Sequence, residues 1–84
     1  MNPTRFKLLR RQIAELLNAG KPLLTPEYQL LNDLRVMLNQ PPTQAEFDHV
    51  IGRMESARQI IRHRTEDEGV KTKLTETGEA ELLT

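Results

Sequence analysis

The sequence contains no cysteine and no tryptophan, and its only aromatic residues are Phe6, Tyr28 and Phe47. The lack of cysteine excludes disulfides and thiolate zinc sites. With so few aromatic rings, the chain has little to offer as a stacking platform for single-stranded nucleic acid. A chain of 84 residues buries only a small core. We therefore expect its stability to come from regular helix packing or from a partner subunit.

Long apolar runs are also missing. No stretch approaches the roughly 20 apolar residues that span a bilayer. The first basic residues, among them Arg5 and Lys7, interrupt apolar positions instead of preceding an apolar block, unlike a secretory signal. We expect a soluble, cytoplasmic protein with no membrane partner.

No catalytic constellation is present in the sequence. His49 and His63 are the only histidines, and on a single helix their separation of fourteen residues would span about 21 Å, too far to share a metal. An HExxH motif, a phosphate-binding glycine loop and a nucleophile elbow are all absent. We expect no enzyme activity, no catalytic residues, no metal and no cofactor.

The formal net charge is zero, but the charge is unevenly distributed. Residues 1–64 contain ten Lys/Arg against six Asp/Glu, a net charge of plus four. Residues 65–84 contain two lysines against six acids, a net charge of minus four. This asymmetry predicts a basic body followed by an acidic tail.

Apolar residues recur at helical spacing in three segments, and each segment has a start signal. Asn2-Pro3 and Thr25-Pro26 each place a capping residue before a proline. Thr43 to Glu46 is a capping box. The spacing predicts helices over about 3–18, 26–39 and 44–64, with this apolar stripe: Phe6, Leu9, Ile13, Leu16, Leu17, Leu30, Leu31, Leu34, Met37, Leu38, Phe47, Val50, Ile51, Met54, Ala57 and Ile61.

The predicted fold class is therefore all-α, a three-helix bundle made of a helical hairpin and a long third helix. After Thr65 the apolar spacing fails, and glycine, threonine and alternating charges dominate. We expect a helical domain over residues 1–65 and a mobile acidic tail over 66–84.

Three apolar residues, Leu8, Val36 and Ile60, lie outside the stripe, and Arg58 occupies a stripe position. Scattered surface hydrophobes are normal, and this is one interpretation. The other is a second apolar surface that a second copy or another protein covers. We predict that Leu8, Val36, Ile60 and Arg58 form a partner or self-association interface.

Basic residues fall mainly in the first and third expected helices. Their forked or flexible cationic ends suit phosphate groups. The charge is spread around the third helix and does not form a single stripe, which is weaker than usual for a nucleic-acid-binding domain. The candidate nucleic-acid contacts are Arg5, Lys7, Arg10, Arg11, Arg53, Arg62 and Arg64.

The segment TQAEFDHVIG, residues 43–52, resembles the first helix of a phage-repressor-type helix-turn-helix, in which a Thr-Gln start is followed by a turn glycine. The resemblance covers residues 43–62 and implies two short DNA-binding helices. It departs at Asp48, where that motif has a small buried residue, and at Arg58, where it has an apolar one. RMESARQIIR continues the apolar spacing after Gly52, so we predict one long helix instead.

Together these patterns favour a small non-enzymatic interaction module, a regulator, inhibitor or adaptor of bacterial or phage type that covers a surface of a larger protein. We expect it to form a homodimer. The alternative is a nucleic-acid-binding regulator that uses a degenerate helix-turn-helix or its basic helices.

Overall fold

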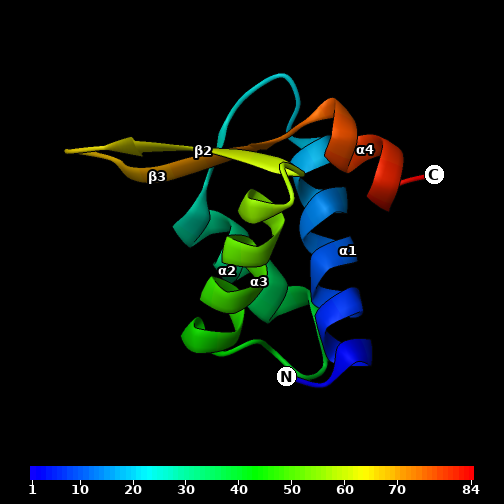
Figure 1. Cartoon of the computed structure of the whole chain (residues 1–84). Helices are drawn as coiled ribbons and strands as arrows, with labels where there is room; N and C mark the ends of the chain where they lie inside the picture. Colours follow the sequence, from blue (N-terminus) through cyan, green and yellow to red (C-terminus); the bar gives the residue numbers. More distant parts are fainter.

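The computed structural model describes residues Met1–Thr84 and contains both helices and a small antiparallel sheet (Figure 1). The elements, in chain order, are α1 (Pro3–Ala19), β1 (Thr25–Pro26), α2 (Glu27–Met37), α3 (Gln44–Ser56), β2 (Ile60–Thr65), β3 (Gly69–Leu74) and α4 (Glu76–Leu82). The expected all-α three-helix bundle is therefore wrong: the chain is a mixed helix and sheet protein.

The first two expected helices correspond to α1 and α2. Helices α1 and α3 each begin after a residue whose side chain caps the helix start. Asn2 Oδ1 accepts from the Thr4 amide at 2.7 Å. Thr43 Oγ1 accepts from the Glu46 amide at 3.1 Å, and Glu46 Oε1 accepts from the Thr43 amide at 3.1 Å. These local hydrogen bonds satisfy backbone donors that a helix start leaves free.

The third helix is shorter than expected, because α3 ends at Ser56 and the chain reverses into a strand. Arg58 makes this turn with a left-handed backbone, at a φ of 60°. Ile60 then pairs with Leu74, and the ladder runs to Thr65 opposite Gly69. The β-branched pair Ile60-Ile61 suits a strand as well as a helix, and the pairing with β3 decides between them.

The expected mobile acidic tail is also wrong as a description of the fold. Residues of this segment form β3, which lies in the middle of the sheet order β1-β3-β2, and then α4. Thr75 caps α4, accepting from the Gly78 amide at 2.9 Å. In Figure 1 α4 lies beside the end of α1, and the two helices are in contact.

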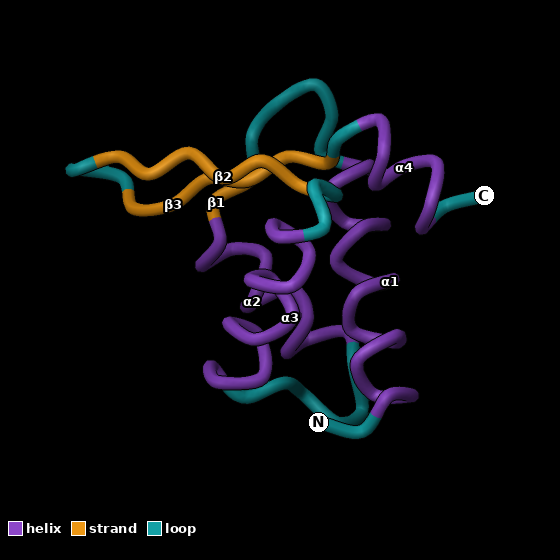
Figure 2. Tube along the Cα trace, in the orientation of Figure 1, coloured by secondary structure: helices purple, strands orange, loops and turns teal.

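Strands β2 and β3 form a hairpin that extends beyond the helices, while the short β1 pairs only with the middle of β3 (Figure 2). Thr25 pairs with Thr72, and Pro26 pairs with Lys71. The hairpin is thus anchored at one end and free at the other.

A single apolar core joins all the helices to the base of the hairpin. Ile60 belongs to it and is 2% exposed, so the expectation of a surface Ile60 is wrong. The core side chains are Leu9, Ile13, Ala14, Leu17, Leu30, Leu31, Leu34, Phe47, Val50, Ile51, Met54, Ile60, Leu74 and Leu82. No helix combines the length and apolar character needed to cross a membrane.

Candidate nucleic-acid interface

Helix α3 packs against the core on one side and presents polar side chains on the other. Its buried side chains are Phe47, Val50, Ile51 and Met54, one face of a helix. Its exposed side chains include Gln44, Asp48, His49 and Arg53. Gln44 Nε2 donates to Asp48 Oδ1 at 2.9 Å, one turn along. The exposed face therefore offers hydrogen-bond donors and acceptors on a rigid support.

An ion pair to α1 fixes the start of α3. Arg5 donates from Nε and Nη2 to the two Glu46 carboxylate oxygens, at 3.3 and 3.4 Å. The Arg5 guanidinium, followed by the Thr43 amide, holds the pKa of Glu46 below its ordinary value. The same carboxylate thus caps α3 and ties it to α1.

The connection between α2 and α3, residues 38–43, also packs against the rest of the structure. Pro42 is buried, and Arg35 Nε on α2 donates to its carbonyl at 3.5 Å. α2 ends at Met37, where Leu38 becomes extended, and the double proline keeps the preceding Gln40 out of helical geometry. Helices α2 and α3 are therefore joined by an ordered connection, and α3 presents its polar face outward.

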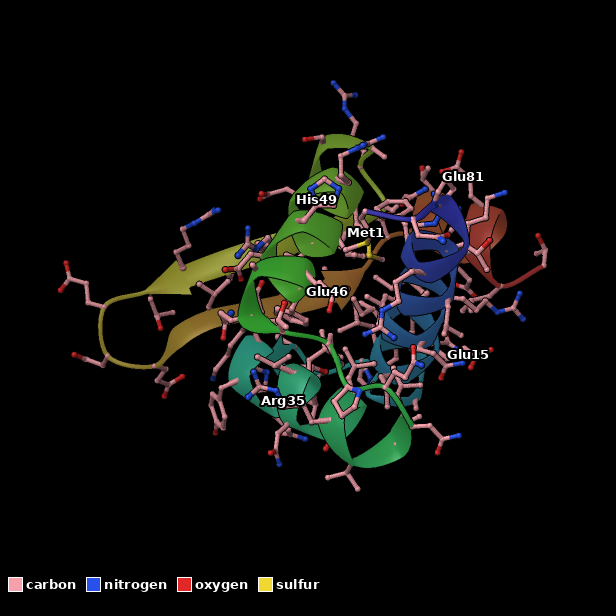
Figure 3. The ribbon with its side chains drawn as sticks, turned by 90° about the horizontal axis from the view of Figure 1, so that it is seen from below. Met1, Glu15, Arg35, Glu46, His49 and Glu81 are labelled. Atoms are coloured by element: carbon pink, nitrogen blue, oxygen red, sulfur yellow. The ribbon has the colours of Figure 1, made fainter.

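A basic hollow lies between α1 and α3, with a volume of about 270 Å³. Phe6 on α1 lines it, with the Arg10 guanidinium 5.2 Å and the Arg53 guanidinium 5.5 Å from the ring centroid. The His49 ring meets Phe6 edge-on at 6.0 Å. Lys7 also lines this hollow, which we call the α1/α3 basic hollow. Figure 3 shows His49 on α3 with Met1 between it and α1.

The lysines and arginines divide into two groups by their ion pairs. Six of the twelve are paired with carboxylates: Arg5, Arg11, Lys21, Arg62, Arg64 and Lys71. The six without a carboxylate partner are Lys7, Arg10, Arg35, Arg53, Arg58 and Lys73. Three of these six, Lys7, Arg10 and Arg53, line the α1/α3 basic hollow. Half of the unpaired cations therefore line this one hollow.

A charged network locks the base of the hairpin to α2. Glu27, at the start of α2, accepts from Arg62 Nε at 2.6 Å and from Arg62 Nη2 at 2.8 Å. It also accepts from the buried Thr72 hydroxyl at 2.6 Å. The Glu27 carboxylate raises the pKa of Arg62. Glu55, on α3, contacts Arg62 at 3.4 Å and Arg64 at 3.6 Å.

The tip of the hairpin is acidic. Glu66, Asp67 and Glu68 are consecutive and exposed. Glu68 pairs with Lys71, which lowers the pKa of the Glu68 carboxyl. Carboxylates at this tip repel phosphate, so the tip itself is a poor contact for a nucleic-acid backbone.

The structure separates the candidate nucleic-acid contacts named from the sequence. Lys7, Arg10 and Arg53 lie together, and Arg5 is adjacent but engaged with Glu46. Arg11 pairs with Glu15 on the same helix at 3.0 Å. Arg62 and Arg64 were expected on a third helix and instead lie on β2, where carboxylates hold both.

The proposed interface residues are also dispersed. Leu8 and Val36 are 43% and 80% exposed, whereas Ile60 is in the core. Arg58 is exposed, but in the α3–β2 turn and not on a helical seam.

Sequence patterns did not identify Phe6, His49 or Gln44 as site residues. Phe6 and Arg10 are four residues apart, a spacing that brings two helix side chains together and signals their contact. The contribution of His49 and Arg53 to the same hollow has no sequence signal, because it depends on how α3 packs against α1.

No three His, Asp or Glu side chains come together as a metal site; His49 is on α3 and His63 on β2. No protein-family model, curated protein or solved structure matches the chain.

Proposed function

We propose that this protein is a non-catalytic domain that binds double-stranded DNA through the exposed face of α3. The order α1-β1-α2-α3-β2-β3 and the sheet order β1-β3-β2 are those of winged helix-turn-helix domains. In a helix-turn-helix the second helix enters the major groove. Because a fold does not by itself define a function, the proposal depends on the α3 surface.

The outward face of α3 supports the proposal most directly. Gln44 can form two hydrogen bonds with adenine, and Asp48 can accept from the cytosine amino group. These side chains are exposed on a helix whose start is doubly fixed, by its capping box and by Arg5. A helix fits the wide major groove of DNA but not the deep, narrow major groove of RNA.

Selection of duplexes from a random pool, followed by fluorescence anisotropy on the enriched sequence, tests this function. We expect Gln44→Ala to lose about 1–3 kcal/mol of discrimination at one base pair. Gln12→Ala, the same substitution on α1, provides the matched control. Failure to enrich any sequence, together with equal affinity for single strands, would contradict the proposal.

A specific observation favours a second function, contact with another copy of this chain. Leu8, Met37 and Leu38 line a hollow of about 400 Å³ beside Arg5 and Gln40. The adjacent Val36 is largely exposed. Apolar surface of this kind is often a protein contact. A self-associating regulator with a cytoplasmic location, as the sequence predicts, is compatible with DNA binding, because dimers read two half-sites.

Light scattering on Leu8→Glu/Val36→Glu tests this second function. We expect the wild type to have the mass of two chains, and the variant that of one with unchanged circular dichroism. Glu substitution of the exposed Leu23 and Tyr28 gives a control of equal charge. A wild-type mass of one chain over the whole concentration range would exclude self-association.

A further inference from the structure

We propose that the α1/α3 basic hollow binds a phosphate group of the nucleic-acid backbone, which fixes the position of α3 on the duplex. This inference rests on the proposed function and names a contact within it. Phosphate contacts set register and orientation, whereas base contacts set sequence preference. The hollow would be the main positioning contact of the domain.

The first argument is the absence of a counter-charge. Lys7, Arg10 and Arg53 line one hollow, and none pairs with a carboxylate, although half of the chain's cations do. Like charges brought together repel one another unless an anion joins them. Glu46, a carboxylate on α3, is already held by Arg5. The missing partner is therefore an anion from outside the chain.

The second argument is that Phe6 holds the cations in place. The Arg10 and Arg53 guanidinium groups both lie over its ring, at 5.2 and 5.5 Å from the centroid. A cation over an aromatic face is attracted to it, so these long side chains lose some of their freedom before any ligand arrives. Arg10 Nε is buried and has no hydrogen-bond acceptor. The site is thus partly organised and lacks an acceptor.

The third argument is position. His49 and Arg53 line the hollow and also belong to the outward face of α3. Gln44 and Asp48, which would contact the bases, each precede one of these two residues by five positions, or about 7.5 Å along the helix axis. Guanidinium forks fit phosphate oxygens, and the Lys7 ammonium adds a point charge. The bound group is therefore a phosphate adjacent to the bases that α3 reads.

The salt dependence of DNA affinity provides the first test. Each lost phosphate contact reduces the slope of log K against log salt by about 0.9. Because the hollow holds one phosphate, Lys7→Gln/Arg53→Gln should reduce the slope by about 0.9 on a random 20-base-pair duplex. The single variant Arg53→Lys keeps the positive charge, so its DNA affinity should show the same salt slope as the wild type.

Arg58→Gln/Lys73→Gln is the matched control, since it removes two unpaired cations outside the hollow. Arg58 is in the α3–β2 turn, and Lys73 is on the face of β3 opposite the buried Thr72 and Leu74. We expect the control to keep the wild-type slope. An equal loss in both double variants would overturn the proposal, because the effect would then be one of net charge alone.

Binding of inorganic phosphate provides a second test, which distinguishes a failure of the phosphate site from a failure of the proposed DNA-binding function. Titration at constant ionic strength, with chloride as reference, should shift the Phe6 and His49 ring signals of the wild type but not of Lys7→Gln/Arg53→Gln. If duplex DNA does not bind but phosphate causes these shifts, the function fails and the site is one for free phosphate. If the substitutions change neither the phosphate-induced shifts nor the salt slope of DNA affinity, the phosphate site itself is excluded.

Discussion

At the scale of single residues, two glycines differ in whether the fold has room for a side chain at their position. A Cβ on Gly78 would lie 2.1 Å from the Gln59 carbonyl oxygen, a backbone atom that accepts from the Thr75 amide. A Cβ on Gly52, inside α3, would meet nothing within 4 Å. Gly78 is thus required where α4 crosses the α3–β2 turn, while Gly52 is not.

We predict that Gly78→Ala lowers the free energy of unfolding by about 1–3 kcal/mol, because the backbone must move to relieve the overlap. Gly52→Ala should raise it by up to about 1 kcal/mol, through helix propensity alone. Urea denaturation of both variants measures these changes. Equal effects of the two substitutions would show that α4 does not pack on this turn.

The Glu46 carboxyl links stability to pH. Its pKa in the folded chain is below the ordinary value of 4.5, because Arg5 and the Thr43 amide favour the charged form. Its stabilising contribution is therefore complete above pH 4.5 and is lost as pH falls through the lowered folded pKa. We predict that Glu46→Gln is less stable than the wild type at pH 7, and that the difference shrinks in this acidic range. A difference that stays constant from pH 7 to pH 3 would contradict the Arg5 contact.

At the scale of elements, Glu27 decides how the hairpin is attached to the helices. It accepts from Arg62 and from the buried Thr72, joining the start of α2 to β2 and β3. We predict that Glu27→Gln costs about 1.5–3 kcal/mol, the range for hydrogen bonds to charged groups. Hydrogen exchange of the hairpin amides should accelerate more than that of α1. Glu15→Gln, which breaks an exposed pair on α1, should cost less than about 0.5 kcal/mol.

The starts of α1 and α3 could be read from the sequence because their capping residues act within a few positions. The end of α3 could not. Ile60 and Ile61 fit a helical stripe, and only pairing with residues 69–74 makes them a strand. The sequence did not predict the left-handed backbone at Arg58, because such a conformation is uncommon outside glycine. Strand pairing and left-handed turns are decided by the whole fold, so short segments do not reveal them.

At the scale of the whole molecule, the site was only partly foreseeable. Lys7, Arg10 and Arg53 were among the seven basic candidates, but the sequence did not distinguish them from Arg5 or Arg62. The difference lies in partners far along the chain: Arg5 meets Glu46, and Arg62 meets Glu27. Packing of α1 against α3 then gathers the unpaired cations. The acids that make the charge of the sequence asymmetric lie at the hairpin tip and on α4. The unpaired cations Lys7, Arg10 and Arg53 line the α1/α3 basic hollow.

The most direct measurement of where nucleic acid binds is the map of backbone amide shifts when duplex DNA is added to the isotope-labelled chain. The DNA-binding account predicts that the largest shifts fall on the exposed face of α3, from Gln44 to Arg53, and on Lys7 and Arg10 of α1. Shifts concentrated on α4 or around Leu8 and Val36, with α3 unchanged, would contradict it.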